Sequence, residues 1–144
     1  MLADFVEKDR SIEELEGDRW PEPPEDSTSL VRGVHALRRR PIKALGVEDL
    51  RRLIGQDVGL RWLLPVALDI LRKTAPDEAV TGWYDDDLLS AVLTRKESVW
   101  RSAPELATHL DETVTMLTDL SPYIQREVDD FRSSLSDLLR RGNR

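Results

Sequence analysis

The sequence predicts an all-α fold, a compact single-domain helical bundle of about six or seven helices that ends in a C-terminal antiparallel helical hairpin. Three observations predict this class. Apolar residues recur at helical spacing in several segments. No segment alternates apolar and polar residues as a half-buried strand does. The 144 residues, 40% of them hydrophobic, are enough to bury a single core.

Three apolar stripes predict the helices of the first half. In chain order they are Leu30, Val34 and Leu37; Val47, Leu50, Leu53 and Ile54; and Leu60 through Leu71. The third stripe covers most sides of a helix, so we expect it to be the central buried element. Pro65 should kink that helix or mark its true start. Before the first stripe, the sequence WPEPPED (Trp20 to Asp26) contains three prolines and should be an extended loop.

The second half contains three further stripes. They are Leu88, Leu89, Val92 and Leu93; Leu106, Leu110, Val114 and Leu117; and Ile124, Val128, Phe131, Leu135 and Leu138. We expect Asp85–Asp87, the Ser102–Glu105 capping box and Ser121 to cap these three helices. The break at Asp119–Ser121 is short, so the last two helices should form the hairpin.

Charge and composition favour a protein partner over a nucleic acid or a membrane. The net charge is −7, whereas affinity for phosphates needs many Lys and Arg contacts. Residues 1–31 carry −7, residues 32–73 carry +6 and residues 74–130 carry −9, so acid-rich segments surround a basic middle. The absence of cysteine and of a secretory or membrane-spanning stretch predicts a cytoplasmic protein.

No catalytic, cofactor-binding or metal-binding constellation is evident, and we expect the protein not to be an enzyme. His109 and Glu112 share a helix face, but a metal would need further ligands. A surface histidine beside a carboxylate is therefore the favoured interpretation, with a metal-dependent enzyme as the alternative. The glycines are scattered singly, so no phosphate-binding loop is formed.

A basic group in the middle of the chain has two interpretations. It consists of Arg38, Arg39, Arg40, Lys43, Arg51, Arg52 and Arg61. These residues could grip phosphates, which would make the protein a small helical nucleic-acid-binding regulator that uses residues 38–61. We favour the alternative, in which they lie over the core and pair with the acidic flanks.

Two acid–aromatic patches are the candidate binding residues for a basic protein partner. The first is Trp83, Tyr84, Asp85, Asp86 and Asp87, which could equally be a helix cap with core aromatics. The second is the Trp20 loop with Glu22, Glu25 and Asp26. Aromatic anchors supply affinity at interfaces, and carboxylates supply complementarity to a basic surface.

Three blocks of the sequence resemble the contact-dependent growth inhibition immunity proteins. They are SIEELEGDRWPEP (Ser11 to Pro23), LRRRPIKALGVEDLRRLIGQDVGLRWLLPVALDIL (Leu37 to Leu71) and DDDLLSAVL (Asp85 to Leu93). The resemblance covers roughly residues 11–100. Gly46 stands where the family usually has a threonine-like cap, which should slightly weaken the helix that follows. Residues 1–10 are an N-terminal extension that we expect to be flexible, and residues 11–144 form the helical immunity-protein-like domain.

The resemblance implies that the protein binds and neutralises the C-terminal toxin domain of a cognate contact-dependent or polymorphic toxin. Many such toxins are nucleases, so the implied partner is a basic protein domain bound in the cytoplasm. The shared blocks consist of core and turn residues, and they do not define a contact surface or an oligomeric state. No cofactor, direct nucleic-acid contact or membrane contact is implied.

Overall fold

A computed structural model of the protein describes residues 2–81, 88–117 and 120–142, with the side chains of residues 75–81 and 139–142 left undescribed. The elements in chain order are η1 (Leu2–Phe5), α1 (Ile12–Glu16), α2 (Ser29–Arg38), η2 (Ile42–Ala44), α3 (Val47–Gly55), α4 (Leu60–Thr81), α5 (Leu88–Leu93), α6 (Glu97–Ser102), α7 (Pro104–Thr115) and α8 (Pro122–Gly142). In the described ranges no strand occurs, and one isolated bridge joins Ser11 to Pro41. The predicted all-α fold is confirmed.

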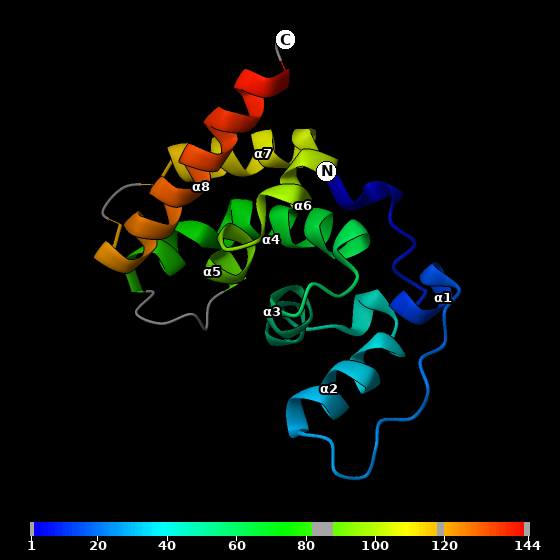
Figure 1. Ribbon diagram of the computed structural model, residues 1–144. Coiled ribbons are helices and arrows are strands. Elements are labelled where there is room, and N and C mark those ends of the chain that lie inside the picture. The colour runs from blue at the N-terminus through cyan, green and yellow to red at the C-terminus, as the bar shows by residue number, and fades with distance from the viewer. Residues whose placement is uncertain (1, 82–87, 118–119, 143–144) are drawn as a thin grey trace.

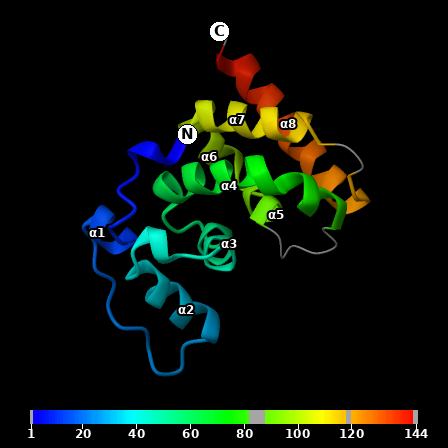
Figure 2. The same ribbon diagram turned by 180° about the vertical axis from the view of Figure 1, so that it is seen from behind.

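Helix α4 is the central element, as the sequence predicts. It packs against η1, α3, α5 and α7, and its residues Leu63, Ala67, Leu68 and Leu71 have no exposed surface. Helix α8 lies across α5, α6 and α7, which confirms the C-terminal hairpin in outline. Figures 1 and 2 show α8 and α2 at opposite ends of the molecule, with α4 between them.

Side chains cap several helices where the sequence supplies a suitable oxygen. Ser121 Oγ accepts a hydrogen bond from the Ile124 N–H at 3.3 Å, which confirms the predicted start of α8. Ser11 caps α1 in the same way at 3.1 Å, and its partner Glu14 completes the capping box. At α3 the cap position is Gly46, whose N–H donates to the Asp49 carboxylate at 3.0 Å. Because glycine offers no side-chain oxygen, α3 has only half of a capping box.

The predicted capping box at Ser102 is wrong. Ser102 belongs to α6, a short helix that the apolar periodicity did not reveal, and its hydroxyl donates to the Ser98 carbonyl at 3.0 Å. Helix α7 instead begins at Pro104, with Ala103 at the cap position and no side-chain cap. Proline suits the first helical position because its missing N–H would have no partner there. The predicted cap Asp85–Asp87 of α5 lies outside the described residues.

Pro65 lies inside α4 and does not mark its start. The helix begins at Leu60, where the N–H groups of Trp62 and Leu63 donate to the Gly59 carbonyl. Pro65 cannot donate to the carbonyl of Arg61, four residues earlier, so α4 continues past a missing hydrogen bond. This interruption lies in the part of α4 that faces η1 and the start of α7.

The N-terminal segment packs on α4. The Asp69 carboxylate accepts hydrogen bonds from the N–H groups of Leu2, at 3.0 Å, and Ala3, at 2.8 Å. Ala3 and Val6 are buried in the core cluster, whereas Phe5 is 72% exposed. None of the described helices combines the length and the apolar character needed to cross a membrane.

Candidate partner-binding site

The acidic loop is the candidate site that the structure describes best. It connects α1 to α2 and presents Glu22, Glu25 and Asp26, all three of which are exposed. The loop lies beside α2, at the end of the molecule away from α8 (Figure 1). The sequence thus predicted correctly that these carboxylates lie on the surface.

Trp20, at the start of this loop, packs against α2 and is half-buried. Its ring lies 3.8 Å from the guanidinium carbon of Arg38 and meets the His35 ring edge to face, with the centroids 5.1 Å apart. Arg38 is 1% exposed and donates to the Glu16 carboxylate at 3.1 Å and to the Asp18 carbonyl at 2.9 Å. Trp20 therefore contributes to the fold of the loop, so the loop offers a partner its carboxylates more than its aromatic ring.

Two arginines at α2 contact this loop, and one of them neutralises a carboxylate. Arg39 donates to the Glu22 carboxylate at 2.8 Å, and Arg32 donates to the backbone carbonyl of Glu25. A hollow of about 400 Å³ lies between these groups and α2. The carboxylates of Glu25 and Asp26 form no ion pair with another described residue, so they remain available to a basic partner.

The other predicted patch, Trp83, Tyr84, Asp85, Asp86 and Asp87, lies outside the described residues. Its role in binding stays a prediction. The structure describes the two helices that flank it, α4 and α5, which pack against each other.

Ion pairs neutralise most of the basic group at residues 38–61. Besides the Arg38–Glu16 and Arg39–Glu22 pairs, Lys43 lies 2.7 Å from Asp9, and Arg51 pairs with Glu48. Four of its seven cations thus have carboxylate partners, and one of these four is buried. These four pairs support the interpretation in which the group stabilises the fold, because a cation held by a carboxylate is less available to a phosphate. Arg40, Arg52 and Arg61 are exposed and form no ion pair with another described residue.

An arginine occupies the space between His109 and Glu112. Arg72 Nη2 lies 3.3 Å from His109 Nδ1 and 3.3 Å from Glu112 Oε2. Burial lowers the pKa of His109, and the adjacent Arg72 cation lowers it further, against the opposing effects of Asp69 and Glu112. A guanidinium in this place would repel a metal cation, and the described residues contain no group of three or more metal-ligating side chains.

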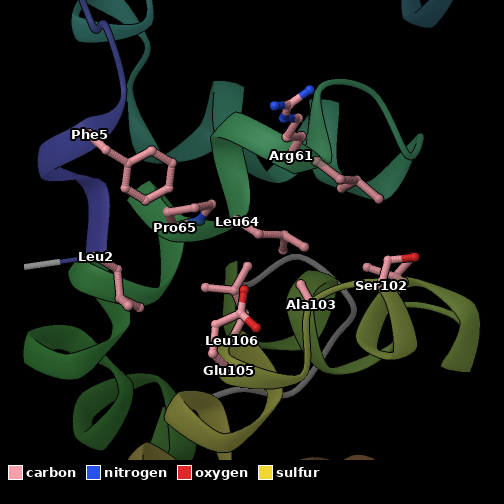
Figure 3. Close-up of a pocket in the computed structure, with 11 residues that line it drawn as sticks. Leu2, Phe5, Arg61, Leu64, Pro65, Ser102, Ala103, Glu105 and Leu106 are labelled. Atoms are coloured by element: carbon pink, nitrogen blue, oxygen red, sulfur yellow. The ribbon is translucent and has the colours of Figure 1, made fainter.

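An apolar groove that no sequence pattern predicts lies beside α4 and α7, and we call it the α4–α7 groove. It has a volume of about 590 Å³ and lies between η1, the first turns of α4 and the junction of α6 with α7. Figure 3 shows Leu64 and Pro65 of α4 facing Leu106 of α7 across it, with Phe5 and Leu2 at one side. Three segments that are distant in the sequence form this groove: η1, the start of α4 and the α6–α7 junction. The one local signal was Pro65 inside an otherwise continuous helical pattern.

Comparison with known proteins supports the resemblance seen in the sequence. The family model described as CDI immunity proteins, where CDI denotes contact-dependent growth inhibition, matches residues 14–110, which is more than half of the chain. No curated protein matches the chain. The matched region runs from α1 to within α7, so it includes the acidic loop, the basic group and most of the α4–α7 groove. The chain therefore belongs to the family of CDI immunity proteins.

Proposed function

We propose that this protein binds the C-terminal toxin domain of its cognate contact-dependent growth inhibition toxin and thereby neutralises it. Immunity against a toxin follows from the family. The finer part of the proposal is that the toxin domain is a nuclease with a basic substrate-binding surface, and that binding takes place in the cytoplasm. Immunity proteins of this kind are generally not enzymes, so protection would rest on stoichiometric binding.

The observation that carries the proposal is the acidic, solvent-exposed loop on a chain of net charge −7. The carboxylates of Glu22, Glu25 and Asp26 are exposed, and Arg38 and Trp20 hold their loop against α2. A loop that is already ordered loses little conformational entropy on binding. Carboxylates on such a loop attract a basic surface and raise the rate of association.

We propose the same role for the acid–aromatic segment Trp83, Tyr84, Asp85, Asp86 and Asp87. Its support is the sequence pattern alone, with two aromatic side chains followed by three carboxylates. Together with Glu22, Glu25 and Asp26 it forms our set of proposed toxin contacts.

Co-expression with the toxin domain encoded by the adjacent upstream reading frame tests the function. We expect the two proteins to co-purify in a one-to-one ratio and the toxin domain to lose its activity on tRNA, rRNA or DNA. Growth inhibition that persists in the presence of the protein, with no co-purification, would contradict the proposal. Inhibition of a toxin that is not a nuclease would contradict only its finer part.

Charge reversal tests the proposed contacts. Replacing Glu22, Glu25 and Asp26 by lysine should slow association with the toxin domain on the order of tenfold at low ionic strength. The decrease of the association rate with added salt should also become shallower, because less attraction remains to be screened. Reversing Asp85, Asp86 and Asp87 tests the second segment in the same way.

The matched control is reversal of Asp129, Asp130 and Asp137 on α8. It changes the net charge by the same amount at the opposite end of the molecule (Figure 1). If the loop and control variants slow association equally, the effect depends on net charge alone and the loop is not the contact. A gel shift with generic DNA and RNA should show no binding by the unsubstituted protein, because its net charge is −7 and four of the seven cations at residues 38–61 are paired.

A further inference from the structure

The α4–α7 groove exposes apolar surface even though its walls are firmly packed. Leu64 and Leu106 are 2% and 7% exposed and belong to the core cluster. On the opposite side Phe5 is 72% exposed, although Asp69 holds the backbone of its helical turn in place. The groove is therefore a preformed depression beside the core. Apolar surface of this kind, with polar groups at its edge, is typical of an interaction site.

Hydrogen-bond acceptors border this apolar surface. The carbonyl of Arg61 lacks its usual helical donor because Pro65 has no N–H, and residues 61 and 65 lie on the same face of α4. Ser102 Oγ uses its proton on the Ser98 carbonyl, so lone pairs remain on the hydroxyl oxygen. Both residues line the groove. An occupant that buries these atoms should bring a hydrogen-bond donor.

A carboxylate at the edge of the groove adds a charge preference. Glu105 is exposed in the first turn of α7 and forms no ion pair with another described residue. Glu97 in the preceding helix α6, by contrast, forms an ion pair with Arg101. Figure 3 shows Glu105 next to Leu106, at the α7 side of the groove. A cationic side chain of a partner would complement Glu105 there.

We propose that the groove receives a tryptophan or tyrosine side chain of the cognate toxin domain, and that a neighbouring lysine or arginine of the toxin pairs with Glu105. This inference rests on the proposed function. An aromatic ring with one N–H or O–H group matches an apolar groove bordered by acceptors. The acidic loop attracts the toxin domain, whereas the groove holds it and sets the dissociation rate.

The test fills the groove and reverses its charge without touching buried residues. Ser102→Trp places a large ring in the groove from the last turn of α6, and Glu105→Lys repels the expected cation. Ser133→Trp and Asp137→Lys, at exposed positions of α8, are matched controls. Binding to the purified toxin domain is measured by surface plasmon resonance, and circular dichroism checks that each variant keeps its helical signal and melting temperature.

We expect each groove variant to weaken binding about tenfold or more, mainly through faster dissociation, and the controls to stay within about twofold. Groove variants that bind like the unsubstituted protein would overturn the proposal, as would controls that weaken binding equally. If the unsubstituted protein binds and protects while the groove variants are unaffected, only this inference fails. If the unsubstituted protein does not bind the toxin domain, the proposed function fails with it.

A second copy of the chain is the competing occupant. In that case the unsubstituted protein would sediment as a dimer on its own, and Ser102→Trp would make it a monomer. That result would overturn the proposal of a toxin side chain in the groove.

Discussion

Arg38, the last residue of α2, connects this helix to α1 and to the start of the acidic loop. Its buried guanidinium contacts the Trp20 ring, the Glu16 carboxylate and the Asp18 carbonyl, all of which precede α2. A buried cation is tolerated only when such groups replace its water. Arg39, the next residue, is 35% exposed and pairs with Glu22 on the surface.

Replacement of these two neighbours should therefore have unequal effects. Arg38→Ala should lower the free energy of unfolding by about 2 to 3 kcal/mol, because Glu16 and Trp20 lose their shared partner. Arg39→Ala should cost about 0.5 kcal/mol, as is usual for an exposed ion pair. Urea unfolding followed by circular dichroism measures both. Equal losses in the two variants would show that the Arg38 contacts do not stabilise the loop.

His109 gives the stability of the protein a dependence on pH. Because burial and Arg72 lower its pKa in the folded state, the unfolded state takes up the proton first as the pH falls. The contribution of neutral His109 is complete above its ordinary pKa of 6.5 and is lost as the pH falls from there through the lowered folded-state pKa. Urea unfolding between pH 7.5 and 5.5 should therefore show a smaller loss of stability for His109→Gln than for the unsubstituted protein. Identical pH profiles would mean that His109 titrates alike in both states.

At the scale of elements, the glycine that connects α3 to α4 allows α1 to pack closely against this connection. Gly59 connects α3 to α4 with a φ of +65°, and a Cβ there would lie 2.7 Å from Ile12 Cδ1 of α1. Gly59→Ala should cost about 2 kcal/mol or more, since it combines left-handed strain with a clash in the core. Gly17→Ala is the control, because Gly17 has a φ of +66° but nothing within 4 Å of a Cβ. It should cost about 1 kcal/mol. A Gly59→Ala loss no larger than that of Gly17→Ala would mean that Ile12 moves aside freely.

A substitution at the start of α3 should stabilise the protein, in contrast to the two glycine substitutions above. Gly46 has an extended backbone, and a Cβ there would make only an ordinary 3.7 Å contact with Asp49. Gly46→Ser would supply the missing side-chain oxygen and should raise the free energy of unfolding by roughly 0.5 kcal/mol. Thermal unfolding should show a higher midpoint for this variant. A lower midpoint would mean that the new hydroxyl disturbs the hydrogen bond between Asp49 and the Gly46 N–H.

At the scale of the whole molecule, the sequence predicted the helices with long apolar stripes, such as α3 and α8, and the Ser121 cap. It did not predict α1 or α6, because each of these short helices has only two large apolar side chains, too few to show a helical period. Helix α5 is as short as α6 but has four, and its stripe was predicted. Residue patterns identify which face of a helix is apolar but not which faces meet. The exposed carboxylates of the acidic loop could thus be predicted, whereas the α4–α7 groove could not, since its walls come from three distant segments.

The N-terminal segment links the stability of the fold to the groove. The sequence predicts a flexible extension over residues 1–10, whereas in the structure Ala3 and Val6 are buried and the Asp69 carboxylate accepts hydrogen bonds from the N–H groups of Leu2 and Ala3. Removing residues 1–10 should lower the free energy of unfolding by about 3 kcal/mol, because apolar contacts and two hydrogen bonds to a carboxylate are lost. Phe5→Ala is the control and should cost at most about 0.5 kcal/mol, because Phe5 is 72% exposed.

Both variants should nevertheless bind the toxin domain more weakly, because each removes part of the groove wall formed by η1. Urea unfolding and surface plasmon resonance on the same preparations separate the two effects. If the shortened chain unfolds at the same urea concentration as the whole protein, the segment is indeed a flexible extension. If Phe5→Ala leaves both stability and affinity unchanged, η1 plays no part in toxin binding, and the contact is confined to α4, α6 and α7.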